Sequence, residues 1–153
     1  MGKVILLAVL TMDGCLADSS EKARKWLAGT NRYGIAEMKK NAHMLNENTP
    51  LTLLSGWIKD SLSVFLMEAG SSTISIINGM LRMRQFDEII FYIIPVIAGN
   101  GCRLFQSRLP ETTWTCHAVE TYKDGTVKST YRRKNFLSVQ KKDTSLLRKL
   151  FRK

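Results

Sequence analysis

The sequence predicts one α/β domain with a mostly parallel central sheet, flanking helices and a C-terminal antiparallel hairpin. Residues 4–10 and 89–94 are apolar runs without polar alternation, as expected for strands that are buried on both faces. Along residues 63–101 the pattern predicts a strand, a glycine turn, a helix and a second strand. This unit joins parallel strands through a right-handed crossover. Residues 113–120 and 126–132 flank a Tyr-Lys-Asp-Gly turn, and Asp-Gly is a strong hairpin signal.

The first third of the chain is predicted to hold a strand, two helices and a second strand. Thr-Met-Asp-Gly ends the strand at 4–10 with a turn. The segment 19–31 carries a Trp-Leu pair among charges, and its closing Gly-Thr-Asn predicts a break before the next helix. Apolar residues then recur at helical spacing over 35–45, which predicts an amphipathic helix. A polar loop at 46–50 precedes a predicted strand at 51–54.

The segment around Glu68 carries the functional prediction. Residues 64–67 form a short apolar run, and Glu68 follows at its carboxyl end, where the ligands of open α/β sheets gather. Gly70 can adopt a positive φ, and the hydroxyl residues after it suit the start of a helix, whose amides attract phosphate. The alternative is an ordinary crossover with a surface glutamate, since the helix dipole stabilises acids at a helix start.

Length and charge distribution predict one domain with a basic tail. A chain of 153 residues is long enough for one buried core. Residues 132–153 hold nine bases and one acid, which is +8, whereas residues 1–131 hold fourteen bases and twelve acids, which is +2. We therefore expect a domain at 1–133 and a basic, helical tail at 134–153. The tail could dock on the domain or a second copy, or bind phosphates of a membrane or nucleic acid. Because no aromatic platform is interleaved with its bases, we expect neither nucleic acid nor membrane as a partner.

Cysteine usage and hydropathy predict a cytoplasmic protein without a metal site. Cys15, Cys102 and Cys116 are odd in number and widely spaced, and only His43 and His117 could join them as ligands. Neither a disulfide framework nor a zinc site is therefore expected. No apolar stretch approaches the length of a membrane span, and the N-terminal run lacks the features of a signal peptide.

Several short motifs occur together in one order along residues 4–133. They are Thr-Met-Asp-Gly at 11–14, Lys-Trp-Leu-Ala-Gly at 25–29, Met-Glu-Ala-Gly-Ser at 67–71, Phe-Asp-Glu-Ile at 86–89 and Pro-Val-Ile-Ala-Gly at 95–99. In these motifs the chain resembles the reductase domain of the riboflavin-biosynthesis protein RibD, a branch of the dihydrofolate-reductase-like fold. The block from 63 onward is the most specific part of the resemblance.

The resemblance implies an NADPH-dependent reductase of a 5-amino-6-(5-phosphoribosylamino)uracil-like substrate, working as a homodimer. Glu68 would face the substrate as the catalytic acid or base. The implied substrate-binding residues are Asp13 and Asn48, and the implied cofactor-binding residues are Trp26, Gly70, Ser71, Ser72 and Thr73. Asp13 and Trp26 also have plainer interpretations from the residues alone. Asp13 precedes a glycine at a strand end, which is typical of a turn, and Trp26 could be the apolar anchor of a short helix.

The chain also departs from the family that it resembles. Leu7 stands where the family usually has a lysine on the first strand, and Glu-Asn-Thr-Pro at 47–50 replaces a longer Gly and Thr loop. The deaminase half, with its zinc signature, is absent from the sequence. The alternative to a reductase is therefore a catalytically degenerate member that binds a nucleotide-like ligand or a partner without turnover.

Overall fold

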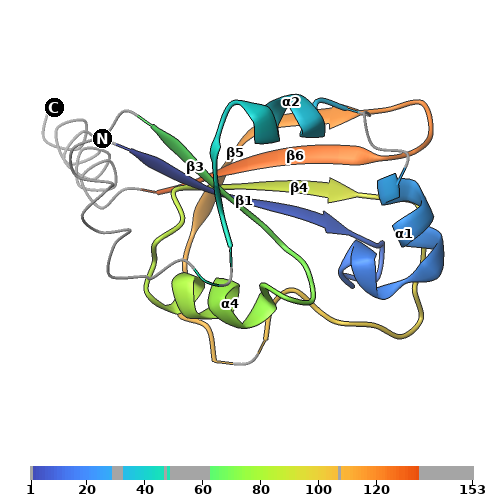
Figure 1. The fold of residues 1–153 in the computed structure, drawn as a ribbon, viewed down its shortest axis with the longest axis horizontal. Coiled ribbons are helices and arrows are strands. Elements are labelled where there is room, and N and C mark those ends of the chain that lie inside the picture. The colour runs from blue at the N-terminus through green and yellow to red at the C-terminus, as the bar shows by residue number, and fades with distance from the viewer. Residues whose placement is uncertain (1, 29–32, 47, 49–62, 107, 135–153) are drawn as a thin grey trace, which may run out of the picture.

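A six-stranded sheet forms the centre of the molecule (Figure 1). The computed structural model describes residues 2–28, 33–46, 48, 63–106 and 108–134. The strands are β1 (Lys3–Leu10), β2 (His43–Leu45), β3 (Val64–Glu68), β4 (Glu88–Ile93), β5 (Trp114–Thr121) and β6 (Val127–Arg133). The helices are the short 3-10 helix η1 (Ala17–Ser19) and the α-helices α1 (Glu21–Ala28), α2 (Ile35–Lys40) and α4 (Ile74–Arg82).

The strand order is β2-β3-β1-β4-β6-β5, so the first strand of the chain lies inside the sheet. The pairs β2–β3, β3–β1 and β1–β4 are parallel, whereas β4–β6 and β6–β5 are antiparallel. The predicted fold class is confirmed. It is a dihydrofolate-reductase-like α/β fold with a C-terminal hairpin, and its parallel strands all end at one edge of the sheet.

Two hydrophobic cores explain why β1 contains almost no polar residue. Leu6 and Ala8 face the core under α4, which also contains Ile77 and Met80 of that helix. Alternate β1 residues face a second core, which α1 and α2 cover from the other side of the sheet (Figure 1). Burying one leucine side chain completely contributes about 1.5–3 kcal/mol, so a run that is apolar on both faces suits the central position.

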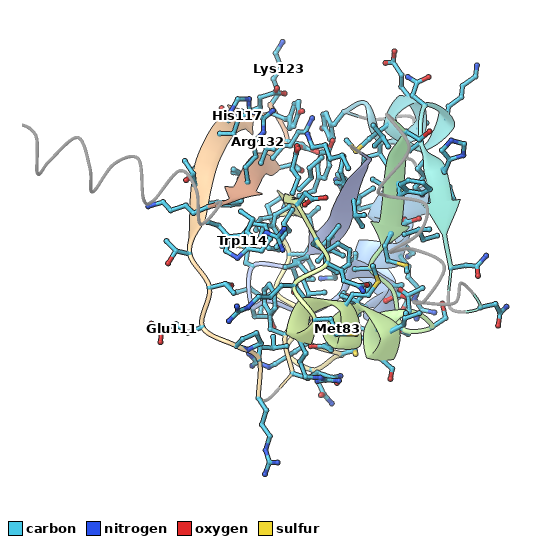
Figure 2. All side chains as sticks on the ribbon, turned by 90° about the vertical axis from the view of Figure 1, so that its left-hand side faces the viewer. Met83, Glu111, Trp114, His117, Lys123 and Arg132 are labelled. Carbon is cyan, nitrogen blue, oxygen red and sulfur yellow. The ribbon has the colours of Figure 1, made fainter. Side chains whose placement is uncertain are left out.

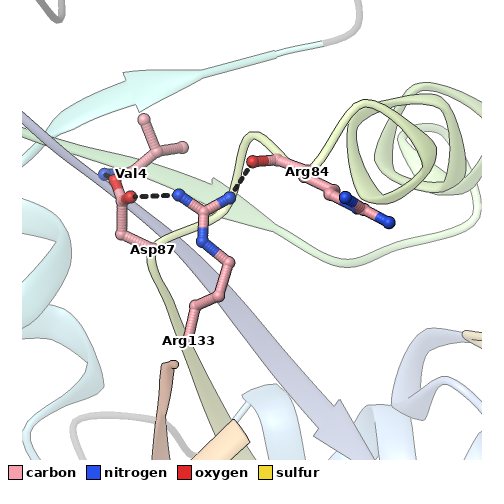
Figure 3. A network of polar contacts seen from close by, with 4 residues as sticks. All are labelled: Val4, Arg84, Asp87 and Arg133. Atoms are coloured by element: carbon pink, nitrogen blue, oxygen red, sulfur yellow. Dashed lines mark hydrogen bonds and ion pairs between the residues drawn. The ribbon is translucent and has the colours of Figure 1, made fainter. Parts of the chain in front are cut away.

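Polar contacts fasten the amino-terminal end of the sheet, opposite the carboxyl ends of the parallel strands (Figure 3). The carboxylate of Asp87, just before β4, accepts the backbone amide of Val4 at 2.9 Å. The guanidinium of Arg133, at the end of β6, lies 3.3 Å from the same carboxylate and donates to the carbonyl of Arg84. These contacts join β1, β4 and β6 and close the turn after α4.

The structure also corrects one predicted element. The helix expected over 35–45 ends at Lys40, and Leu45 belongs to β2, which pairs with β3. Leu45 is buried as predicted, but it is buried as a strand residue. The predicted strand at 51–54 and the predicted helical tail from 135 onward lie outside the described residues.

Candidate functional site

Glu68 is the last residue of β3, at the carboxyl edge of the parallel strands, as predicted. Its carboxylate forms an ion pair with Lys39 of α2, with 2.7 Å between Nζ and Oε2, and about a third of each side chain is exposed. On the neighbouring strand, the residue in register with Glu68 is Leu7, which is fully buried. The cation beside Glu68 comes from helix α2, and sequence reasoning missed Lys39 because its contact with Glu68 depends on the fold.

The turn after Glu68 uses several of its own polar groups internally. The amide of Gly70 donates to the hydroxyl oxygen of Thr73 at 3.0 Å, and that hydroxyl donates to the carbonyl of Glu68 at 2.8 Å. Thr73 is buried, whereas Ser71 and Ser72 are exposed. Of the predicted cofactor residues in this turn, Thr73 thus closes the turn, whereas the two serines lie at the surface.

The amide of Ser71 donates to a carboxylate that the sequence did not point to. Asp18 of η1 accepts this amide on Oδ2 at 2.7 Å and the Ser71 hydroxyl on Oδ1 at 3.1 Å. A Cβ added at Gly70 would lie 3.0 Å from Asp18 Oδ2, so the glycine allows the carboxylate to come close. A protein anion therefore binds Ser71, in the turn just before the N-cap Thr73 of α4, within the segment where a phosphate was predicted.

The parallel pairing of β1 with β3 explains how Asp18 reaches Ser71 across 53 positions of sequence. Parallel strands end at the same edge of a sheet, so the segments that follow β1 and β3 lie next to each other there. Asp18 follows the first strand closely in sequence, and this is the signal that could have identified it.

Asp13 joins two loops at this edge of the sheet. Its carboxylate accepts the backbone amides of Ala98 at 3.1 Å and Gly99 at 2.9 Å, and the hydroxyl of Thr11 also donates to it. Hydrogen bonds lower the pKa of Asp13 to about 2. The largest contribution comes from the Thr11 hydroxyl, and the next from the amide of Ala98. These contacts support the turn interpretation of Asp13; its role in substrate binding stays a prediction.

Trp26 of α1 packs in a row of aromatic rings. Its indole stacks on Tyr33 with 6.0 Å between ring centroids, and Tyr33 stacks on Tyr122 at 3.9 Å. The indole N–H of Trp26 donates to Asp124 of the hairpin turn at 3.4 Å. These contacts support the interpretation of Trp26 as an anchor between α1 and the hairpin. Tyr33 and Tyr122 were not singled out in the sequence, because their contact depends on the fold.

Asn48 is exposed, and its amide donates to the side-chain oxygen of Asn46 at 2.8 Å. This is a local turn contact. Among the described contacts, none joins Asn48 to Glu68, so its predicted role in substrate binding is not tested by the geometry.

A cavity of about 500 Å³ opens on the sheet face that α4 covers, near the end of α4 and the start of β5. In Figure 2, Trp114 and Glu111, which line the cavity, lie along the segment that leads into β5, and Met83 marks the end of α4. The walls include the apolar residues Leu81, Phe86, Ile89, Phe91, Phe105, Leu109, Pro110 and Trp114. No predicted site residue lines this cavity.

Within the described part of the chain, no group of three or more histidine, cysteine or acidic residues could hold a metal ion. Nor does any helix in that part have the length and hydropathy needed to span a membrane.

Comparison with known proteins gives a family match over the central segment. The family model described as the RibD C-terminal domain matches residues 59–128. The predicted resemblance to this family is confirmed. No curated protein matches the sequence.

Solved structures of RibD-type proteins share the fold of this chain. A Shewanella sp. PV-4 protein named as a riboflavin biosynthesis protein is 15% identical with a TM-score of 0.64, over 87% of this chain and 99% of that one. A pyrimidine reductase-like protein from Corynebacterium diphtheriae is 11% identical with a TM-score of 0.56, over 87% and 92%. A bifunctional diaminohydroxyphosphoribosylaminopyrimidine deaminase and 5-amino-6-(5-phosphoribosylamino)uracil reductase from Thermotoga maritima is 14% identical with a TM-score of 0.55, over 87% and 57%.

Proposed function

We propose that the protein is a reductase of the riboflavin-biosynthesis type, which uses NADPH to reduce a 5-amino-6-(5-phosphoribosylamino)uracil-like substrate. The observation that carries the proposal is the meeting of Glu68 with the start of α4 at the carboxyl edge of the sheet. Both lie within the segment that matches the RibD C-terminal domain. The reductase activities in the names of structurally similar proteins support the same reaction class.

The residues present give the proposed reaction a proton-handling group and a cation. When bound, NADPH would supply the hydride, so the protein has to orient two ligands and manage protons. Glu68 would exchange a proton with the substrate. Lys39, at 2.7 Å from its carboxylate, holds that side chain toward α2 and would fix its direction.

The turn that leads into α4 does not fit a pyrophosphate group in the described arrangement. The amide of Gly70 already donates to Thr73, and the amide of Ser71 already donates to the Asp18 carboxylate. A second anion at the same amides would be repelled by that carboxylate. NADPH binding in the proposed mode therefore requires Asp18 to move.

Titration with NADPH followed by fluorescence, and NADPH oxidation in the presence of the pyrimidine substrate, test the proposed activity. We expect measurable oxidation, lowered about 10²- to 10⁴-fold in Glu68→Gln, because general acid–base catalysis contributes this much. Glu111→Gln, a matched exposed variant beside the cavity, should retain activity. No NADPH binding at millimolar concentration would rule the reductase out.

The second candidate is a catalytically degenerate member of the same family that binds a nucleotide-like ligand or a partner without turnover. The specific observation in its favour is the Asp18 carboxylate on the Ser71 amide, together with Leu7 beside Glu68. It predicts binding of the pyrimidine without oxidation of NADPH. NADPH oxidation that depends on Glu68 would exclude it.

We further propose a domain at 1–133 with a separate tail at 134–153, a homodimer, and a cytoplasmic location. The domain boundary is supported by β6, which ends at Arg133 with its guanidinium held by Asp87. Size-exclusion chromatography with light scattering would measure the oligomeric state of the full chain.

A further inference from the structure

We propose that the cavity beside the end of α4 is a binding site for a small aromatic anion, separate from the proposed reductase site. Arg84 would bind the anionic group, and the aromatic side chains that line the cavity would hold the apolar part of the ligand. The inference goes beyond the proposed function, because it concerns the other end of the sheet.

The cavity lies at the opposite end of the sheet from Glu68. Glu68 ends the parallel strand β3, whereas Phe86, which lines the cavity, precedes the parallel strand β4. Trp114 and Arg133 also line the cavity, and they are register partners where β5 begins and β6 ends. A ligand bound here would therefore leave the carboxyl edge of the parallel strands free.

The size and the walls of the cavity suit a ligand that carries rings. Its volume of about 500 Å³ lies within the range of about 300–1,000 Å³ that is usual for small-molecule sites. Phe91 packs edge to face against Phe105 and Tyr131, with ring centroids 6.2 and 5.9 Å apart. Phe105 nevertheless keeps 48% of its surface exposed. These side chains therefore leave aromatic surface on which a further ring can pack.

Of the two arginines that line the cavity, Arg84 is the one available to a ligand. The guanidinium of Arg133 is already held by the Asp87 carboxylate and by the carbonyl of Arg84. Among the described contacts no acid pairs with the Arg84 guanidinium, which in Figure 3 extends away from the Arg133–Asp87 pair. Glu111 also lines the cavity, but it is exposed and in Figure 2 projects away from α4. An anionic group can thus bind Arg84 without displacing a protein acid.

The backbone at Arg84 is a second, independent observation in favour of a binding role. Arg84 follows the last turn of α4 with a φ of +54°, a left-handed conformation that favours glycine. Its amide donates to the carbonyl of Leu81 at 3.1 Å, and the amide of Gln85 donates to the carbonyl of Met80 at 3.0 Å. Glycine is the usual residue at this position of such a helix end. An arginine there lowers stability, and a local conflict of this kind is expected where a side chain serves a site.

The experiment measures the binding of two fluorescent probes to the full-length protein at physiological salt. The probes are 8-anilino-1-naphthalenesulfonate and N-phenyl-1-naphthylamine, which share one aromatic body and differ by the sulfonate group. We expect Arg84→Gly to lower the affinity for the sulfonate about tenfold, because a charge-assisted hydrogen bond is lost, and to leave the affinity for the uncharged probe unchanged. The matched control is Arg82→Gln, which removes an exposed arginine that is not among the described residues lining the cavity.

Arg84→Gly also separates a loss of binding from a loss of folding. Glycine adopts the left-handed conformation without strain, so the thermal midpoint of this variant should be equal to that of wild type or higher. Phe105→Ala changes an exposed ring at the cavity and should lower the affinity for both probes by about two- to tenfold, because both use the aromatic contact.

Equal affinity of the sulfonate for wild type and Arg84→Gly would overturn the inference, as would an equal loss in Arg82→Gln. Absence of probe binding to wild type would also overturn it, whether a second copy of the chain covers the cavity or the cavity is closed in solution. NADPH should not displace the sulfonate, and displacement would assign the cavity to the reductase site instead. If NADPH itself does not bind while the probe results hold, the reductase proposal falls and this inference stands.

Discussion

Two aspartates at one edge of the sheet use their carboxylates to hold backbone amides. Asp13 accepts the amides of Ala98 and Gly99, and Asp18 accepts the amide of Ser71. In each case the carboxylate joins segments that are far apart in sequence. The sequence indicated Asp13, because Asp-Gly marks a turn, but its long-range partners could not be predicted. Asp18 has no such local mark, and its partner follows a different strand.

The low pKa of Asp13 predicts that this single residue makes the stability of the protein depend on pH. Its pKa of about 2 in the folded protein lies below the ordinary value of 3.8, so its contribution to stability is present above about pH 4. That contribution is lost as the pH falls through about 2, where the Asp13 carboxylate becomes protonated in the folded protein as well. Urea unfolding midpoints between pH 2 and pH 5 should therefore fall more steeply in wild type than in Asp13→Asn. Parallel pH profiles would contradict this prediction.

Substitution of Trp26 separates its two interpretations, an anchor of α1 and a cofactor contact. Replacing a fully buried aromatic residue by alanine lowers the free energy of unfolding by about 3–5 kcal/mol. Trp26 is only half-buried, so if its ring anchors α1 on the hairpin, Trp26→Ala should lower the free energy of unfolding by at most this amount. Trp26→Phe should recover much of that loss by keeping the contact with Tyr33. Thermal unfolding measures both variants. Unchanged stability in Trp26→Ala, with NADPH affinity lowered, would instead identify a cofactor contact.

At the scale of single elements, the success of sequence reasoning depended on how many interpretations a pattern allowed. A short, uninterrupted apolar run with β-branched residues, such as β1 or β4, favours a strand that is covered on both faces, and both were predicted. Leu45 fitted a helical repeat and also a short strand, and pairing of β2 with β3 decided between them. Such pairing depends on residues distant in sequence, so local spacing could not settle it.

Helix α4 contains a glycine whose replacement tests the helix itself. Gly79 lies in its interior, and a Cβ added there would meet nothing within 4 Å. Gly79→Ala should therefore stabilise the protein by about 0.5–1 kcal/mol, because glycine is a poor helix former. The control is Gly125→Ala in the hairpin turn, where φ is +91° and the substitution should destabilise. Chemical denaturation of both variants measures the two signs, and a loss of stability in Gly79→Ala would contradict the prediction.

At the scale of the whole molecule, the described residues up to 134 contain the six-stranded sheet and both cores. Lys134, the first residue of the proposed tail, donates its amide to the carbonyl of Thr113 at 3.3 Å. The fold class could be predicted because the apolar strands, the glycine turn and the Asp-Gly hairpin are each marked locally in the sequence. The candidate site could be predicted only in part, because it is assembled from segments that follow different strands.

Deletion of residues 134–153 tests the proposed division of the chain. We expect the shortened protein to keep its circular dichroism spectrum and thermal midpoint, because β6 and the Arg133–Asp87 pair remain. NADPH affinity at physiological salt should also be unchanged. A large drop in the thermal midpoint would mean that the tail is part of the folded domain.

The interior position of β1 has a consequence for synthesis on the ribosome. The first strand to emerge pairs with β3 from Lys3↔Val64 onward and with β4 from Ile5↔Glu88 onward. A nascent chain therefore leaves one edge of this apolar strand unpaired until β3 has been made, and the other edge until β4 has been made. Such a strand is the kind of segment that aggregates or recruits a chaperone, so expression yield should depend more on translation speed and temperature than on the stability of the finished fold.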